Sequence, residues 1–154
     1  MSCVQTKYFG LLEYREDAVF EFPGGLPAFE NEQRFVLIES PRYGPLVFLQ
    51  SLETSSLCFL ALPIQVLDRN YRLAMGSEDL KTLGLDSKRQ PELGNEVVVL
   101  GLVSVQEDEP ATANLMAPLV MNLKNRRALQ AIREDSLYSH QHPIEQRGME
   151  GGAC

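Results

Sequence analysis

Histidine, cysteine and long apolar runs are all scarce in this chain. It contains two histidines and three cysteines among 154 residues. The widely spaced Cys3, Cys58 and Cys154 do not suggest a disulfide framework, and a reducing compartment fits them better. No apolar stretch is as long as a membrane span, and the N-terminus lacks the basic and apolar segments of a signal peptide. We therefore expect a cytoplasmic protein that does not enter a membrane.

Positive charge is also scarce. The chain has 14 lysines and arginines against 21 acidic residues, which gives a formal net charge of −7. Direct binding to nucleic acid is disfavoured, because nucleic-acid-binding proteins usually present a basic face. An anionic membrane surface would repel the chain as well. A basic protein partner would be attracted at long range. The alternative is that the acidity only maintains solubility.

Signatures of an enzyme are nearly absent from the sequence. The Gly24-Gly25 pair has neither the P-loop nor the dinucleotide spacing and is typical of a turn. Ser51, Ser55, Ser56 and Ser104 have no histidine near them in the sequence. His140 and His142 are two residues apart, yet no cysteine lies at ligand spacing, so no functional metal site is expected. We therefore predict no catalytic residues, no cofactor and no bound metal.

The densest carboxylate cluster is Glu107-Asp108-Glu109. It is either a solvated turn between strands or a charged loop that meets a basic partner. The abundance of carboxylates elsewhere leaves a paired-carboxylate catalytic site open.

Short runs rich in valine, isoleucine and phenylalanine recur along most of the chain, at lengths that suit β-strands. The expected strands are residues 4–9, 18–22, 34–39, 46–51, 57–62, 97–105, 112–115, 119–123 and 128–132, the last of which could equally be helical. Gly101 within the longest run predicts a bulge or a bend, and Cys58 is expected in the core. The short gaps between runs favour antiparallel pairing, and closure into a barrel would remove exposed edges.

One short helix is predicted between a cap at Ser77 and a left-handed Gly84, with Leu80 and Leu83 on its apolar face. The fold class is therefore all-β, mainly antiparallel: a small barrel-like domain with one or two short helices. We expect this single domain at residues 1–145. The polar, glycine-rich residues 146–154 are expected to be a flexible tail.

Several strings occur in collinear order along the chain. They are TKYFG at residues 6–10, FPGGLPAFE at 22–30, LQS at 49–51, DLKTLGL at 79–85 and TANLMAPLVMN at 112–122, followed by Gln130, Tyr138 and His142-Pro143. Together they resemble the family of the bacterial flagellar assembly factor FliW over about residues 4–144. Any single string is weak, whereas the ordered set is specific. Ala28 stands where the family usually has glycine.

The resemblance implies a non-enzymatic, chaperone-like protein that is monomeric alone. Proteins similar to FliW bind flagellin in the cytoplasm, and they bind CsrA, an RNA-binding repressor of flagellin translation. Flagellin then competes for FliW and restores the repression. The competing function classes are a small-ligand-binding β-barrel and an uncharacterised hydrolase. Uniformly apolar strands argue against the first, because they predict a filled core.

The residues considered for partner binding share a polar or charged side chain. They are Glu107, Asp108, Glu109, Gln50, Asn114 and Asn122. For the asparagines and the glutamine, the alternative is that they satisfy backbone groups in tight turns. For Phe29, the choice is between a core position, which composition favours, and a partner contact.

Overall fold

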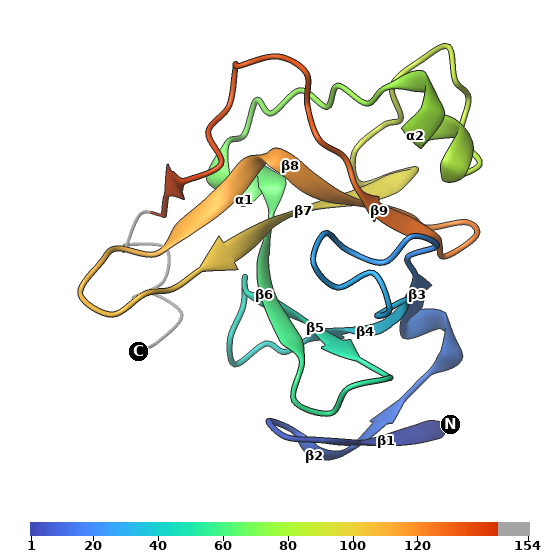
Figure 1. The fold of residues 1–154 in the computed structure, drawn as a ribbon, viewed down its shortest axis with the longest axis vertical. Helices are drawn as coiled ribbons and strands as arrows, with labels where there is room; N and C mark the ends of the chain where they lie inside the picture. The colour runs from blue at the N-terminus through green and yellow to red at the C-terminus, as the bar shows by residue number, and fades with distance from the viewer. Residues whose placement is uncertain (145–154) are drawn as a thin grey trace.

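β-strands dominate the computed structural model, which describes residues 1–144 (Figure 1). The elements in chain order are β1 (Ser2–Thr6), β2 (Gly10–Tyr14), a 3-10 helix η1 (Glu16–Ala18), β3 (Val19–Glu21), β4 (Arg34–Glu39), β5 (Val47–Ser51), β6 (Cys58–Pro63), α1 (Ile64–Leu67), α2 (Ser77–Thr82), β7 (Val97–Ser104), β8 (Thr112–Asn122), β9 (Ala128–Gln130) and β10 (His142–Pro143). The expected boundary at residue 145, the expected tail and Cys154 lie outside the described residues.

One antiparallel sheet forms the body of the molecule. Its strands follow the order β10-β8-β7-β6-β5-β4-β3, and β9 pairs with β8. The sheet curls until its first and last parts meet, where Glu21 bridges Arg127 and the Glu21 N–H donates to the Arg126 carbonyl at 2.8 Å. This contact removes most of the exposed edge of β3. The prediction of an all-β, antiparallel, barrel-like domain is confirmed.

Apolar side chains fill the interior of the curled sheet. Strands β3 to β9 contribute to one cluster, in which Phe22, Phe35, Leu49 and Leu119 are fully buried. Phe22 and Phe35 pack edge to face with ring centroids 5.3 Å apart, the arrangement that aromatic quadrupoles favour. A second cluster covers the opposite face of β7 and β8 and includes side chains from residues 71–83. A filled interior is what the apolar strand pattern predicts.

A separate two-stranded hairpin precedes the barrel. β1 and β2 pair only with each other, and the Lys7 N–H donates to the Ser55 carbonyl of the barrel at 2.9 Å. The expected strand at residues 4–9 is therefore partly wrong, because the chain turns after Thr6 and Gly10 begins a strand that the pattern did not indicate. Leu11 of that strand is 65% exposed, so hydrophobic alternation gives little signal there.

The expected break in the last long strand is also wrong. Residues 112–122 form the single strand β8, although Pro118 lies within it. The β7–β8 register passes from Leu100↔Leu119 to Leu102↔Asn114, so residues 115–118 bulge opposite Gly101. A bulge accommodates proline because the missing N–H is not needed by the ladder. The bulge predicted at Gly101 is confirmed.

The helices are short, as expected, but their starts differ from expectation. α2 begins at Ser77 with Gly76 in the capping position and no capping side chain, so Ser77 is not the N-cap. Gly84 ends this helix at a φ of +73°, as predicted. α1 was not expected. It packs over β7, where a Cβ on Gly101 would lie 3.1 Å from Leu67 Cδ1.

Candidate functional site

The β7–β8 hairpin extends away from the barrel (Figure 1). β6 pairs with β7 only at Ala61, Leu62 and Pro63. Beyond that point β7 and β8 continue to pair with each other as far as Ser104↔Thr112. We call residues 102–114 the β7–β8 arm. Its tip therefore stands clear of the other strands of the barrel.

The tip of the arm carries the three consecutive acidic residues Glu107, Asp108 and Glu109, which are all exposed. Asp108 has a φ of +63°, a conformation that aspartate tolerates in tight turns. Within residues 1–144, none of the three forms an ion pair shorter than 4.0 Å. The turn thus presents uncompensated negative charge to solvent.

A polar groove of about 460 Å³ runs along one face of the arm. Its floor contains the cross-strand pairs Leu102↔Asn114 and Ser104↔Thr112, whose side chains share a face because strand residues alternate. The lining residues are Leu102, Ser104, Gln106, Glu109, Pro110, Thr112, Asn114, His140, Gln141 and Pro143. This mixture of hydroxyl, amide, carboxylate and imidazole groups can donate and accept hydrogen bonds with a polypeptide.

The groove contains no activated nucleophile among the described residues. No hydrogen bond joins Ser104 to His140, although both line the groove. The described residues also contain no group of three His, Cys, Asp or Glu side chains placed to hold a metal ion. None of their helices is long and apolar enough to span a membrane. The expectations of no catalysis and no metal stay predictions.

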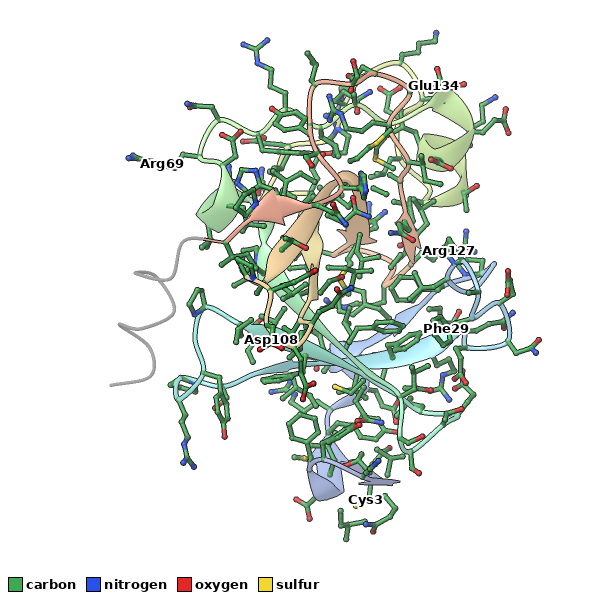
Figure 2. All side chains as sticks on the ribbon, turned by 60° about the vertical axis from the view of Figure 1, so that its left-hand side comes forward. Cys3, Phe29, Arg69, Asp108, Arg127 and Glu134 are labelled. Atoms are coloured by element: carbon green, nitrogen blue, oxygen red, sulfur yellow. The ribbon has the colours of Figure 1, made fainter. Side chains whose placement is uncertain are left out.

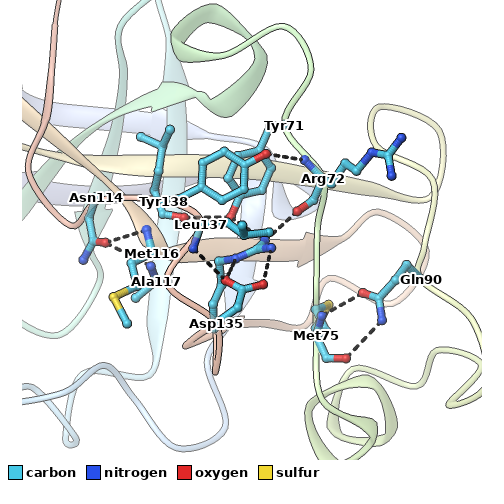
Figure 3. Close-up of polar contacts among 12 residues, drawn as sticks. Tyr71, Arg72, Met75, Gln90, Asn114, Met116, Ala117, Asp135, Leu137 and Tyr138 are labelled. Atoms are coloured by element: carbon cyan, nitrogen blue, oxygen red, sulfur yellow. Dashed lines mark hydrogen bonds and ion pairs between the residues drawn. The ribbon is translucent and has the colours of Figure 1, made fainter.

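A C-terminal segment, residues 131–144, forms the far wall of the groove. The Arg133 guanidinium, almost fully buried, donates to both Asp135 carboxylate oxygens at 2.8 and 2.9 Å (Figure 3). It also donates to the Arg72 carbonyl and to the Tyr71 hydroxyl. The Arg133 guanidinium lies over the ring of Tyr138 at 4.7 Å, close enough for a cation–π contact.

These contacts fix where the segment can lie. Tyr71 donates to the Leu115 carbonyl at 2.7 Å, and the Leu115 N–H donates to the Ser139 carbonyl at 3.0 Å. Three residues after Ser139, β10 begins and pairs with the start of β8. His140 and Gln141 are therefore held beside the groove between two anchored points.

Hydrogen bonds, charges and burial in this network shift the pKa values of its side chains. The Arg133 hydrogen bonds hold the pKa of Asp135 below its ordinary value of 3.8. The same ion pair raises the pKa of Arg133. Burial raises the pKa of Tyr71, and the hydrogen bond from Arg133 partly offsets that rise. Both partners of the pair thus remain charged at neutral pH.

The three amide residues considered for partner binding all bond to the backbone. Gln50 is fully buried, and its Nε2 donates to the carbonyls of Ser51 and Ser55 at 3.1 and 3.2 Å. Asn122 is buried, and its Nδ2 donates to the Leu83 carbonyl at 2.7 Å, which ties α2 to β8. Asn114 is half-buried; its Oδ1 accepts two backbone N–H groups in the β8 bulge. Asn114 is the one of the three that lines the groove, together with Glu109.

The favoured core position for Phe29 is wrong. Phe29 is 39% exposed, whereas Leu26 is 3% exposed. The two residues form a tight bridge in which the Phe29 N–H donates to the Leu26 carbonyl at 2.7 Å. Leu26 packs in the core of the barrel, whereas Phe29 lies at the surface. Cys58 is likewise only half-buried.

The network around Arg133 was not predicted from the sequence. Tyr71, Arg133 and Tyr138 follow no local period and are up to 67 positions apart, so pattern analysis gives no signal. Tyr138 contributed only to the family resemblance. A long-range contact between an arginine and two tyrosines can be found only when the chain is folded.

Comparisons with known proteins give one consistent result. The family model described as "FliW protein" matches residues 3–144. A flagellar assembly factor FliW from Bacillus subtilis (strain 168) is 31% identical over 141 residues, which covers 92% of this chain and 95% of the relative. One from Syntrophomonas wolfei is 35% identical over 148 residues, covering 95% and 90%.

The fold agrees as well. A crystal structure of the flagellar assembly factor FliW superposes with a TM-score of 0.79 at 27% identity. The match covers 92% of this chain and 96% of the other. The similarity therefore includes the hairpin, the barrel and the arm rather than one motif.

Proposed function

This chain belongs to the FliW family, and we propose that it is a cytoplasmic assembly factor with two protein partners. One partner is flagellin. The other is a CsrA-type RNA-binding repressor of flagellin translation, which the chain sequesters. In this account the protein is monomeric alone, turns over no substrate and responds to the amount of free flagellin.

The observation that carries the proposal is the acidic tip of the β7–β8 arm beside a polar groove. An RNA-binding repressor presents basic surface, and Glu107, Asp108 and Glu109 form an exposed anionic patch that complements it. The groove next to this patch offers Asn114, His140 and other groups that can hydrogen-bond to a polypeptide. Gln50 and Asn122 are buried, so a contact with a partner would require them to be uncovered.

The geometry also supports binding over catalysis. The lining of the groove mixes polar and apolar side chains, whereas enzyme sites usually converge on a few groups with shifted pKa values. The groups with shifted pKa values near the groove are Tyr71, Arg133 and Asp135, and all three are engaged in holding residues 131–144. A hydrolase has no assembled nucleophile among the described residues of this groove.

The test is direct binding with purified components. Isothermal titration calorimetry of this protein with monomeric flagellin, and separately with the repressor dimer, should give saturable binding to each. A variant with Glu107→Gln, Asp108→Asn and Glu109→Gln should bind the repressor more weakly. Absence of binding to both partners at about 10 µM, where an affinity near 1 µM would be obvious, contradicts the proposal.

A further inference from the structure

Phe29 is held on the surface by a rigid loop, residues 23–33. Its ring packs edge to face on Phe59 with centroids 5.4 Å apart, yet 39% of the residue remains exposed. The Leu26–Phe29 bridge and a Gln33 Nε2 bond to the Pro23 carbonyl close the loop at its tip and base. An exposed aromatic ring in a fixed orientation is the kind of residue that dominates protein interfaces.

The backbone of this loop enters the left-handed region at Gly25 and Ala28. Gly25 has a φ of +67°, and a Cβ there would lie 2.5 Å from the Glu30 carbonyl oxygen. Ala28 has a φ of +71°, which a residue with a Cβ adopts only at a cost. Strain of this kind persists where the surroundings impose it, and it is concentrated at functional sites. In this loop the residue that bears such a cost, Ala28, directly precedes Phe29.

The base of the same loop forms one wall of a groove of about 450 Å³. Pro23 and Gln33 line it from the loop, and Glu21 and Phe22 line it from the chain just before the loop. Arg34, Lys81 and Arg127 converge on it from β4, α2 and the β8–β9 turn. Figure 2 shows Phe29 and Arg127 on the same side of the molecule. The groove is lined by three cationic side chains and one carboxylate. Its local charge is therefore positive, although the chain carries a net charge of −7.

The cations of this groove are largely unpaired. Within the described residues, no carboxylate lies within 4.0 Å of the charged groups of Arg34 or Arg127, and Lys81 meets only Glu78 at 3.9 Å. Arg127 makes one long bond, 3.4 Å, to the Thr82 carbonyl and keeps its other donors free for a carboxylate. The Glu53 carboxylate lies near the start of β4, where it accepts a hydrogen bond from the backbone N–H of Arg34. The guanidinium of Arg34 is not its partner.

We propose that Phe29 and this basic groove form a docking site for an acidic segment of a partner protein, with an apolar side chain against Phe29 and carboxylates against Arg34, Lys81 and Arg127. The site is distinct from the acidic tip of the arm. The tip is proposed to bind a basic partner, whereas this site binds an acidic one. Because the net charge repels an acidic partner at long range, affinity comes from short-range contacts within roughly one screening length, about 8 Å in physiological salt.

The test uses the isotopically labelled full chain and the peptide acetyl-Glu-Phe-Glu-Leu-Glu-amide, followed by amide chemical shifts. We expect shifts concentrated at Phe29, Lys81 and Arg127, and none of comparable size with acetyl-Lys-Phe-Lys-Leu-Lys-amide. Phe29→Ala and Lys81→Glu should each weaken binding about tenfold, which corresponds to about 1.4 kcal/mol. Lys81 is 62% exposed on its side chain, so its substitution leaves the fold intact.

Two controls match these variants. Lys88→Glu changes an exposed lysine outside the groove, and Ile132→Ala removes an exposed apolar side chain elsewhere. Both should change the affinity less than about twofold.

Three results would overturn the proposal: equal effects from control and groove variants, chemical shift changes centred on residues 107–109, or no binding of the peptide. Displacement of the peptide by inorganic phosphate at lower concentration would identify a small-anion site instead. Concentration-dependent self-association that Lys81→Glu abolishes would assign the groove to a second copy of the chain.

Discussion

Arg133 forms a two-bond ion pair with Asp135, and the same guanidinium ties residues 131–144 to Tyr71 and Arg72. Arg133 Nε lies 2.8 Å from Asp135 Oδ1, and Nη2 lies 2.9 Å from Oδ2. The side chain of Arg133 is 2% exposed and that of Asp135 is 37% exposed. Because the carboxylate remains partly solvated, the pair pays a smaller desolvation cost than a fully buried pair would, while loss of Asp135 would leave the buried Arg133 cation without its partner.

Replacement of Asp135 by asparagine should destabilise the protein and weaken its acid dependence. The pKa of Asp135 is lowered in the folded state, so its contribution to stability is present above the ordinary value of 3.8 and is lost as pH falls through the folded pKa. The difference in melting temperature between the wild type and Asp135→Asn should therefore be larger at pH 7 than near pH 3. An equal separation at both pH values would contradict a role for the carboxylate charge.

Gly25 and Gly24 allow a matched test of the backbone conformation in the loop of residues 23–33. Gly25→Ala should destabilise the protein by about 1–3 kcal/mol, because Gly25 has a positive φ and its Cβ would meet Glu30. Gly24→Ala should be nearly neutral, because nothing lies within 4 Å of the added atom. Urea denaturation measures both. Similar losses from the two substitutions would show that the loop conformation is not as described.

The two described cysteines should differ in reactivity. Burial raises the pKa of Cys58 to about 11, although a backbone hydrogen bond partly opposes this rise. Cys3 is exposed. Iodoacetamide at pH 8 should therefore modify Cys3 and leave Cys58 intact, since the thiolate is the reactive form. Peptide mapping by mass spectrometry distinguishes the two sites, and rapid modification of Cys58 in the folded protein would be the contrary result.

Sequence patterns predicted the barrel better than they predicted the site. The strands at residues 34–39, 46–51, 57–62 and 97–105 agree with β4 to β7 within one residue at each end, because these runs have buried faces that impose apolar side chains. β2 was missed because its hairpin lies outside the barrel and Leu11 is exposed. Hydrophobic periodicity detects burial, so an element with little burial gives little signal.

The sites depended on contacts that no local pattern contains. The acidic turn at residues 107–109 was visible as a charge cluster, but its proximity to His140 follows from the Arg133 network. Phe29 was expected in the core because phenylalanine is usually buried. Its exposure is evident only in the folded loop, where it is bridged to Leu26 and follows the left-handed Ala28.

Neutralising the acidic tip should slow association with the repressor. The variant Glu107→Gln, Asp108→Asn, Glu109→Gln should lower the association rate more than it raises the dissociation rate. The matched control removes three exposed carboxylates elsewhere, with Glu13→Gln, Glu78→Gln and Glu134→Gln. Stopped-flow measurements at several salt concentrations compare the two. Identical association rates for the two variants would show that the acidic tip does not accelerate association with the repressor.

In the proposed function, flagellin and the repressor are coupled through their binding to this protein. Linkage requires each partner to weaken the binding of the other by the same factor, and a useful switch needs at least about tenfold, or 1.4 kcal/mol. The most direct measurement preloads this protein with the labelled repressor, adds monomeric flagellin and follows both the release of the repressor and the return of its RNA binding. We predict release, with RNA binding restored in proportion. A stable ternary complex with unchanged affinities would contradict the claim.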